Sequence, residues 1–366
     1  MATEPVIGWD LGGAHVKAAR LDAAGTVERV MQVPCPVWQG LEHLHGALSE
    51  VLATLGPAAV HAVTMTGEMA DLFSNRTEGV ARLLAALHER LTAGGAGGPG
   101  GSALRCYAGA QGFVRADHAT LAARHVASAN WLASATVVAA AVPDALFVDI
   151  GSTTTDVVVV RGGRVRSAAG DDAQRLLAGE LLYTGVVRTP VMALALNVPF
   201  DGDWVPLMAE QFATAADVHR LTGLLPDTAD QHPAADGGAK SVAGSARRLA
   251  RMIGRDVESA PLAAWQQLAG WLARAQARHI EDAWDRVLSR EPLANGAPVV
   301  VAGVGRFVAA ALAASRGRSV VEFGRLIPVH EAERDRATDS APAVAVAWLA
   351  QRAVNRVPAG GALQPD

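Results

Sequence analysis

One short pattern occurs twice in this chain and restricts the folds that it can adopt. Residues 145–160 read Ala-Leu-Phe-Val-Asp-Ile-Gly-Ser-Thr-Thr-Thr-Asp-Val-Val-Val-Val. Apolar, mostly β-branched residues flank a turn that begins at Gly151, which predicts a strand, a turn and a second strand. Residues 7–17, Ile-Gly-Trp-Asp-Leu-Gly-Gly-Ala-His-Val-Lys, repeat the same skeleton. Two copies of one β-hairpin indicate a duplicated module.

The two copies align residue by residue. Asp10 corresponds to Asp149, Gly12 to Gly151 and Lys17 to Asp156. Glycine lets the backbone approach a ligand closely. Backbone N–H groups and hydroxyls in a turn suit a concave anion site. The turns therefore predict a pair of loops that clamp a phosphate or diphosphate, formed by Gly12, Gly13 and Ala14 in the first copy and by Gly151, Ser152, Thr153 and Thr154 in the second.

Composition limits the class of protein. The chain has 366 residues, of which 50% are hydrophobic and 19% charged, so two domains with sizeable cores are expected. A formal net charge of -4 argues against general nucleic-acid binding, which needs a basic face. Two cysteines imply no disulfide framework. The apolar stretch 132–142 is too short to cross a bilayer, and the first residues lack a signal pattern. We expect a cytoplasmic protein without a membrane segment.

Hydrophobic periodicity places these hairpins in an α/β chain. We expect a long alanine-rich helix over 117–142 and a loop over 197–205. The remaining helices that the spacing predicts are 41–55, 78–91, 241–253, 262–288 and 341–354.

Two polar residues in the first half are further site candidates. Glu68 follows a predicted strand and a glycine, and open α/β sheets bind ligands at such strand ends. A glutamate that begins the next helix is the equally weighted alternative for Glu68. Asn130, in the predicted helix 117–142, is placed to direct its amide into a cleft. By sequence alone, an ordinary hydrogen-bonded polar residue is the favoured reading of Asn130.

The second half offers two more stretches. Residues 179–191 combine Glu180 and Arg188 with glycines and apolar residues, as the wall of a site would. Arg188 can direct two N–H groups at a phosphate or carboxylate, and the alternative is a mutual Glu180–Arg188 ion pair. Gly303 and Gly305 form a Gly-x-Gly between a predicted strand and a helix. That pattern suits nucleotide or phosphate binding, although glycines also serve close packing.

Paired Asp-x-Gly hairpins resemble the phosphate loops of the superfamily of actin, sugar kinases and Hsp70 chaperones. More narrowly, the chain resembles hydantoinase/oxoprolinase-related proteins linked to tetrahydromethanopterin one-carbon transfer, whose archaeal relatives are aminomethylfuran-phenol ether synthases of methanofuran biosynthesis. The stretches that match are 8–19, 63–73, 129–135, 148–158, 179–191 and 210–225. The resemblance implies a two-domain actin-like, RNase H-like duplicated α/β fold with a cleft between the domains. The domains would be 1–144, closed by helix 341–355, and 145–330.

The resemblance also implies a reaction. A relative of these synthases would join aminomethylfuran methyl diphosphate, a furfuryl diphosphate, to the phenol of a tyramine- or tyrosine-derived amine, with diphosphate leaving. Mg²⁺ on Asp10 and Asp149, together with Lys17 and the Ser152–Thr154 loop, would neutralise the leaving group. Glu180 or Asp156 is the expected base for the phenol proton, and Glu68 is a third choice. A homodimer is a further expectation.

Two other functions fit the same residues. A kinase or an ATP-dependent, oxoprolinase-like hydrolase would use Gly303 and Gly305 to hold adenosine. A nucleotide-gated scaffold of the chaperone or actin kind ranks third, because the chain is small and has no peptide-binding extension. Turnover of ATP would favour the first of these, and nucleotide binding without turnover the second.

Overall fold

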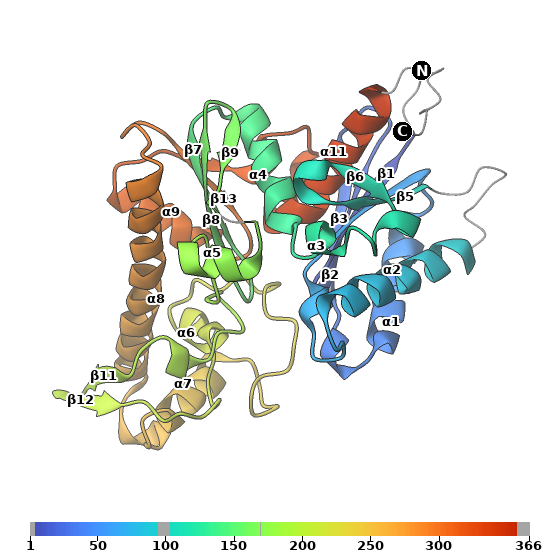
Figure 1. The fold of residues 1–366 in the computed structure, drawn as a ribbon. Coiled ribbons are helices and arrows are strands. Elements are labelled where there is room, and N and C mark those ends of the chain that lie inside the picture. Colours follow the sequence, from blue (N-terminus) through green and yellow to red (C-terminus); the bar gives the residue numbers. More distant parts are fainter. Residues whose placement is uncertain (1–3, 94–102, 169, 357–366) are drawn as a thin grey trace. The chain divides into compact units, whose positions relative to one another are not determined.

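The computed structural model describes residues 4–93, 103–168 and 170–356 (Figure 1). The chain divides into two compact units. Unit 2 is Val142–Glu322, and unit 1 combines the residues before Val142 with those from Phe323 onward. Unit 1 therefore takes in residues 323–340 as well as the final helix. The RNase H-like character of each unit stays a prediction.

Unit 1 is built on a six-stranded sheet in the order β3-β2-β1-β4-β5-β6. β1 pairs with β2 antiparallel and with β4 in parallel, and β2 pairs with β3 antiparallel, so β1, β2 and β3 form a three-strand meander. The strands are β1 (Val6–Leu11), β2 (His15–Leu21), β3 (Val27–Pro34), β4 (Val60–Met65), β5 (Ala103–Tyr107) and β6 (Phe113–Arg115).

Helices pack on both faces of this sheet. Alternate residues of β1 point to opposite faces, so Ile7, Trp9 and Leu11 join the core that α1 and α2 cover. Gly8 faces the final helix α11, where an added Cβ would lie 2.1 Å from the carbonyl oxygen of Ala343. The helices of unit 1 are α1 (Leu41–Leu55), α2 (Arg76–Ala93), α3 (Ala123–Val126), α4 (Asn130–Ala141), α10 (Arg334–Asp339) and α11 (Ala341–Arg356).

The single long helix expected over 117–142 is wrong. The segment forms the 3₁₀ turn η4 (Ala116–His118), α3 and α4 instead. Ser128 breaks the helix because it adopts a left-handed backbone with φ 50°. Its hydroxyl donates to Glu68 at 2.8 Å, a tertiary contact that local helix propensity does not encode.

Unit 2 repeats the arrangement with a second sheet in the order β10-β8-β7-β13-β14, and β9 pairs with β8. β7 and β8 form the predicted hairpin, and β13 runs parallel to β7 on its other side. The strands of this sheet are β7 (Ala145–Ile150), β8 (Thr155–Arg161), β9 (Arg164–Arg166), β10 (Leu181–Leu182), β13 (Val299–Ala302) and β14 (Val320–Glu322).

The long helix α8 connects two cores within unit 2 (Figure 1). Its C-terminal half packs with the sheet around Trp284, and its N-terminal half packs around Trp265. A hairpin covers the second core, so the loop expected over 197–205 is wrong there. The elements outside the sheet are α5 (Asp172–Ala178), β11 (Asn197–Phe200), β12 (Asp203–Pro206), α6 (Ala215–Leu221), α7 (Val242–Arg251), α8 (Leu262–Arg290) and α9 (Arg306–Ser315).

Short 3₁₀ turns connect these elements. Those not already given are η1 (Val37–Gln39), η2 (Gly67–Met69), η3 (Gly109–Gln111), η5 (Val191–Ala193), η6 (Val257–Ser259), η7 (Phe323–Arg325) and η8 (Glu331–Glu333).

Candidate functional site

The turn between β1 and β2 brings an aspartate and a lysine to one face of the sheet. Asp10 pairs directly with Lys17 across the strands, and such partners point to the same side. The turn is closed by a hydrogen bond from the Gly12 amide to the His15 carbonyl at 2.9 Å. Asp10 is buried. The Lys17 ammonium donates to the Asp339 carbonyl at the end of α10, at 3.0 Å.

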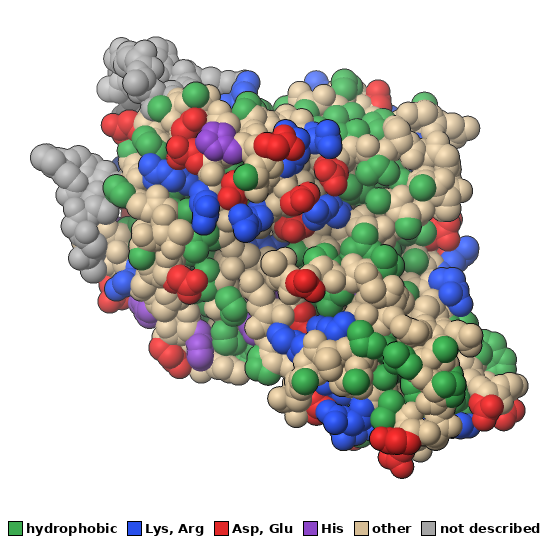
Figure 2. Space-filling model, turned by 180° about the vertical axis from the view of Figure 1, so that it is seen from behind, with side chains coloured by type: hydrophobic (Ala, Val, Ile, Leu, Met, Phe, Trp, Pro, Cys, Tyr) green, Lys and Arg blue, Asp and Glu red, His purple; other side chains and the backbone are tan. Residues whose placement is uncertain are grey.

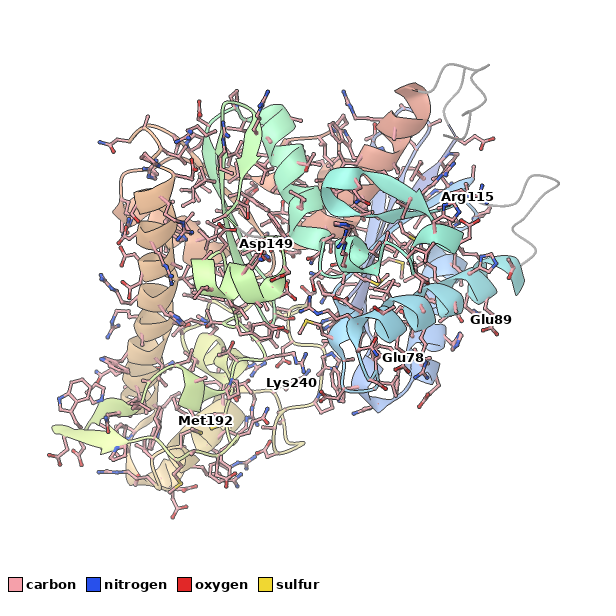
Figure 3. The ribbon with its side chains drawn as sticks, viewed as in Figure 1. Glu78, Glu89, Arg115, Asp149, Met192 and Lys240 are labelled. Carbon is pink, nitrogen blue, oxygen red and sulfur yellow. The ribbon has the colours of Figure 1, made fainter. Side chains whose placement is uncertain are left out.

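The turn between β7 and β8 has the same construction. Asp149, labelled in Figure 3, pairs with Asp156 across the strands, so these two carboxylates also share a face. The Gly151 amide donates to the Thr154 carbonyl at 2.9 Å, the same bond at the same place as in the first turn. Residues 151–154 are all half-buried. The residue-by-residue correspondence predicted between the two hairpins is thus present in both register and turn geometry.

The two copies differ in charge where Lys17 is replaced by Asp156. The Asp156 carboxylate binds Arg175 of α5 at 2.8 Å, and the Arg175 side chain is 1% exposed. Arg175 also donates to the Glu180 carbonyl at 2.9 Å. Burial raises the pKa of Asp156, and the charge of Arg175 opposes that shift. The sequence analysis missed Arg175, because nothing in the surrounding sequence distinguishes it from an exposed helix residue.

The first turn packs against the candidate residue Glu68. The amide of Thr66 donates to the Leu11 carbonyl at 3.1 Å, and a Cβ on Gly67 would lie 3.0 Å from the Gly12 carbonyl oxygen. Glu68 lies in η2, is 1% exposed and accepts from Ser128. It therefore sits behind the turn in the interior of unit 1 and does not begin a regular α-helix.

Asn130 is the first residue of α4. Its side-chain oxygen accepts from the amide of Trp131 at 2.8 Å, a contact at the helix start. The side chain is half-buried. This contact gives Asn130 a structural role at the helix terminus, and its role in binding stays a prediction.

The backbone of residues 185–188 supports the second turn from behind. The amides of Val186 and Arg188 donate to the carbonyls of Gly151 and Ser152 at 3.1 and 2.8 Å. A Cβ on Gly185 would lie 2.4 Å from the Thr153 amide nitrogen, so only glycine allows this approach. The sequence analysis predicted that the side chains of residues 179–191 form the wall of a binding site. In the structure, the main chain of this segment makes the contact with the turn. Burial lowers the pKa of the Arg188 guanidinium.

Glu180 is held by several donors. Its carboxylate accepts from the Ser167 hydroxyl and from the Ala168 amide at 2.8 Å. Arg290 of α8 lies 3.6 Å away. The side chain is buried. These donors satisfy the hydrogen-bonding capacity of a buried carboxylate in unit 2.

Gly303 and Gly305 lie directly against the strand of Asp149. The Gly305 amide donates to the Ile150 carbonyl at 2.8 Å. A Cβ on Gly303 would lie 2.2 Å from that carbonyl and 2.4 Å from Asp149 Oδ1, and Gly303 has φ +81°. The alternative that these glycines serve close packing is therefore supported, and the packing also places their loop beside Asp149.

Comparison with known proteins decides the relationship. The family model described as hydantoinase/oxoprolinase matches residues 59–353. The chain belongs to the hydantoinase/oxoprolinase family.

Individual relatives agree with this assignment. The (4-{4-[2-(gamma-L-glutamylamino)ethyl]phenoxymethyl}furan-2-yl)methanamine synthase of Methanocaldococcus jannaschii is 24% identical over 96% of this chain and 99% of its own length. The protein of the same name from Methanococcus vannielii is 34% identical over 24% of this chain and 42% of its own length. Among solved structures, an acetone carboxylase is similar with a TM-score of 0.57 and 11% identity, over 95% of this chain and 70% of that one.

These matches confirm the predicted family and the two-part actin-like α/β fold. The matched region of the family model begins after the first hairpin, so Asp10 and Lys17 lie outside it. The alignment with the Methanocaldococcus synthase covers nearly the whole chain.

One face of this hydantoinase/oxoprolinase family member carries charges of both signs. Basic and acidic side chains are interspersed on the face shown in Figure 2. Within residues 4–93, 103–168 and 170–356, no group of three or more His, Cys, Asp or Glu side chains could hold a metal ion by itself. In the same part of the chain, every helix is too short or too polar to cross a membrane.

Proposed function

We propose that this chain is a transferase that makes an aryl ether in methanofuran-type cofactor biosynthesis. It would join aminomethylfuran methyl diphosphate to the phenol of a tyramine- or tyrosine-derived amine and release diphosphate. The name of the Methanocaldococcus relative describes such an ether, a phenoxymethyl furan whose phenol carries a glutamylated aminoethyl group. Because that relative aligns with 96% of this chain, we propose a glutamylated tyramine as the acceptor.

The observation that supports the proposal most is the matched pair of turns. Each is closed by an amide-to-carbonyl bond of 2.9 Å and places an aspartate, Asp10 or Asp149, on the strand before it. Turns that expose N–H groups and hydroxyls suit the oxygens of a polyanion. The duplicated turn is therefore the feature of this chain that best suits a diphosphate leaving group.

The donor set also fits Mg²⁺. This ion is usually held by one or two carboxylates together with substrate phosphates rather than by a closed protein cage. Asp10 and Asp149 are the proposed ligands, one at each turn. For an ion held in this way, two carboxylates need no third protein ligand. When bound, Mg²⁺ would neutralise charge on the departing diphosphate.

The proposed reaction breaks one bond and makes one. The bond between the furan methylene carbon and the diphosphate oxygen breaks, and diphosphate leaves with the electron pair. The phenol oxygen then bonds to that carbon, and its proton passes to a carboxylate. Lys17 and the amides and hydroxyls of Ser152, Thr153 and Thr154 would stabilise the leaving group by charge and hydrogen bonding.

Asp156 is the base that we favour over Glu180 and Glu68. It lies beside Asp149 on the same face of the sheet, and burial raises its pKa, which makes it a stronger proton acceptor. All three candidates have partners: Asp156 binds Arg175, Glu180 accepts from Ser167 and Ala168, and Glu68 accepts from Ser128. The choice of Asp156 therefore rests on its place beside Asp149 and on its raised pKa. We also propose that the enzyme acts on small molecules in the cytoplasm, without a nucleic-acid partner.

The deciding experiment is incubation of the full chain with aminomethylfuran methyl diphosphate, γ-glutamyl-tyramine and Mg²⁺. We expect mass spectrometry to detect the ether and an equal amount of diphosphate. Tyramine and tyrosine in parallel reactions test the choice of acceptor. Intact substrates after prolonged incubation of folded protein with all three acceptors would contradict the proposal.

The family itself favours a second candidate. The hydantoinase/oxoprolinase match covers residues 59–353, and this suggests an ATP-dependent hydrolase or kinase. The loop of Gly303 and Gly305 would then hold the adenosine. Release of ADP or phosphate from ATP in the presence of a cyclic amide or another acceptor, without ether formation, would decide for this candidate.

A further inference from the structure

We propose that His219 and Gln276 are positioning residues that hold the second turn in its binding geometry. The proposal rests on the proposed function, in which residues 151–154 bind diphosphate. Neither residue contacts the turn itself. Both act through Thr184 and Gly185, which lie between them and the turn.

The first step is the contact between Gly185 and the turn. A Cβ on Gly185 would meet the Thr153 nitrogen at 2.4 Å and the Gly151 carbonyl oxygen at 2.6 Å. The next three residues all donate amide hydrogen bonds to the carbonyls of Gly151 or Ser152. A shift of the Gly185 peptide must therefore move the backbone that offers N–H groups to the anion.

The second step is the contact between Gln276 and residues 184–185. The Gln276 amide nitrogen donates to the Thr184 hydroxyl and to the Gly185 carbonyl, both at 2.9 Å. Gln276 is 1% exposed and projects from the middle of α8. A 29-residue helix that packs in both cores of unit 2 is a rigid support for this side chain.

The third step fixes the protonation of His219. The Gln276 nitrogen faces the Gly185 carbonyl, which can only accept, so the Gln276 oxygen faces His219. His219 Nε2 lies 2.7 Å from that oxygen and must therefore donate. His219 Nδ1 is buried without a hydrogen-bond partner, which disfavours a second ring proton, and burial lowers the pKa of the ring. Both observations favour the neutral Nε2–H form. The ring of His219 also packs edge-on against Phe307 of α9, with ring centroids 5.2 Å apart.

The arrangement is thus a buried chain of hydrogen bonds from His219 through Gln276 to the peptide behind the turn. Thr155 extends it, since its hydroxyl donates to the Thr184 carbonyl at 2.6 Å. Each link of this chain is a buried hydrogen bond, and breaking one leaves a costly unpaired group, so the links favour one geometry. Among the described residues, only the far side of the ring, His219 Nδ1, ends the chain without a partner. A turn that binds a polyanion through its amides needs this kind of fixed backbone.

The test compares Gln276→Met with Gln266→Met, an exposed glutamine on the same helix. Titration calorimetry measures the dissociation constant for inorganic diphosphate in the presence of Mg²⁺. Hydrogen exchange measures the exchange rates of the backbone amides of residues 151–154. We expect Gln276→Met to weaken diphosphate binding by about tenfold, the effect of one or two lost hydrogen bonds, and to speed exchange in the turn. Gln266→Met should match the parent protein in both measurements.

His219 supplies a second pair of variants. His219→Phe keeps the ring packing but removes the donor, and should show a smaller change in the same direction. His219→Gln restores an N–H donor and should recover both binding and exchange protection. A purely structural role would lower the melting temperature of His219→Phe and His219→Gln alike, without this recovery.

Unchanged diphosphate binding and unchanged exchange in folded Gln276→Met would overturn the proposal. If the parent protein binds no diphosphate, the proposed function fails instead. The exchange of residues 151–154 in Gln276→Met and Gln266→Met then still decides whether the chain from His219 holds the turn.

Discussion

Lys17 and Asp156 occupy the same place in two copies of one hairpin but carry opposite charges. Lys17 faces Asp10, whereas Asp156 faces Asp149. Two carboxylates side by side repel each other unless a cation is near. Arg175 supplies that cation at 2.8 Å from Asp156. In the first copy, Lys17 of the hairpin itself supplies the positive charge. In the second copy, Arg175 of helix α5 supplies it.

Asp149 is the residue whose loss should affect the proposed reaction most. Asp149→Asn removes the charge that would hold Mg²⁺ but keeps the size of the side chain. We expect diphosphate release to slow on the order of a hundredfold, the usual cost of losing one stabiliser of developing charge. Asp282→Asn, on the exposed surface of α8, is the matched control and should react at the parent rate. Near-parent release of diphosphate by Asp149→Asn would exclude a metal role for this aspartate.

The pH dependence of the reaction rate distinguishes Asp156 from Glu180 as the general base. A base acts when it is deprotonated, so the parent rate should fall as the pH drops through the raised pKa of Asp156. Asp156→Asn should be slower by roughly a hundredfold and should lose this acid limb.

Glu180→Gln is the comparison for Asp156→Asn. It should keep the acid limb but unfold at a lower temperature, since it removes the negative charge beside Arg290. Asp156→Asn needs assay well below its melting temperature, because it removes the carboxylate that pairs with the buried Arg175, at a cost of about 3 kcal/mol. An acid limb that persists in Asp156→Asn and disappears in Glu180→Gln would reverse the assignment.

His61 makes the stability of unit 1 depend on pH. Its Nδ1 accepts from the Trp9 indole at 3.0 Å, and burial lowers its pKa to about 4. Below the unfolded pKa of about 6.5 the unfolded chain binds a proton that the folded chain does not. Stability should therefore fall by about 3 kcal/mol as the pH drops from about 6.5 to about 4, with no further loss from His61 below that.

Calorimetric unfolding of the parent protein and His61→Gln across this pH range checks the prediction. Glutamine keeps an acceptor for Trp9 but does not titrate, so the difference between the two proteins isolates His61. If the free energies of unfolding of the two proteins changed with pH in parallel, the lowered pKa of His61 would be contradicted.

At the scale of elements, each hairpin turn depends on a segment that follows much later in the chain. The turn of β1 and β2 packs on Thr66 and Gly67, which follow β4. The turn of β7 and β8 packs on residues 185–188, which follow β10. These supporting segments fix the position of the turn without using a side chain, so glycine is the residue that the contact requires.

Gly185→Ala tests this support. The added Cβ would lie within 2.6 Å of three backbone atoms of the turn, so the turn must move. We expect diphosphate binding to fall by tenfold or more, on the order of the loss of one or two hydrogen bonds. Gly270→Ala, in the helix α8, meets only the end of Arg274 at 3.6 Å and should bind diphosphate as the parent does. Parent-like binding by Gly185→Ala would show that the turn tolerates displacement.

At the scale of the whole molecule, unit 1 combines the N-terminal part of the chain with the segment from Phe323 onward. Helix α11 packs on β1, β2 and β4, although some 300 residues separate them in the sequence. The isolated bridge between Val27 and Val329 and the bond from Val30 to Glu333 make the same connection. Unit 2 is thus inserted between two parts of unit 1 in the sequence.

Gly8→Ala should disrupt the packing of α11 on β1. Its Cβ would lie 2.1 Å from the Ala343 carbonyl oxygen and 2.8 Å from Ala347, so α11 must move away from β1. We expect a loss of about 2–4 kcal/mol in the free energy of unfolding, from overpacking and lost burial. Gly46→Ala, at an exposed position of α1 with open space around it, should instead stabilise by about 1 kcal/mol. Chemical denaturation of both variants measures the difference, and equal effects would contradict the close contact.

The sequence by itself determined the two hairpins, the correspondence between them and the family. These depend on local patterns, because β-branched runs and a glycine turn specify a hairpin within about sixteen residues. Even the correspondence of Lys17 with Asp156 follows from counting along the chain.

Only the tertiary structure decided what surrounds the candidate residues. Arg175 lies 19 residues from Asp156, Ser128 lies 60 from Glu68, and Gln276 lies 91 from Gly185. No local pattern encodes such pairs, since each forms only when separate elements pack together. The same reason explains the break in the helix at Ser128. The alanine-rich sequence favours a continuous helix, but Ser128 has a left-handed backbone and a buried hydrogen bond to Glu68.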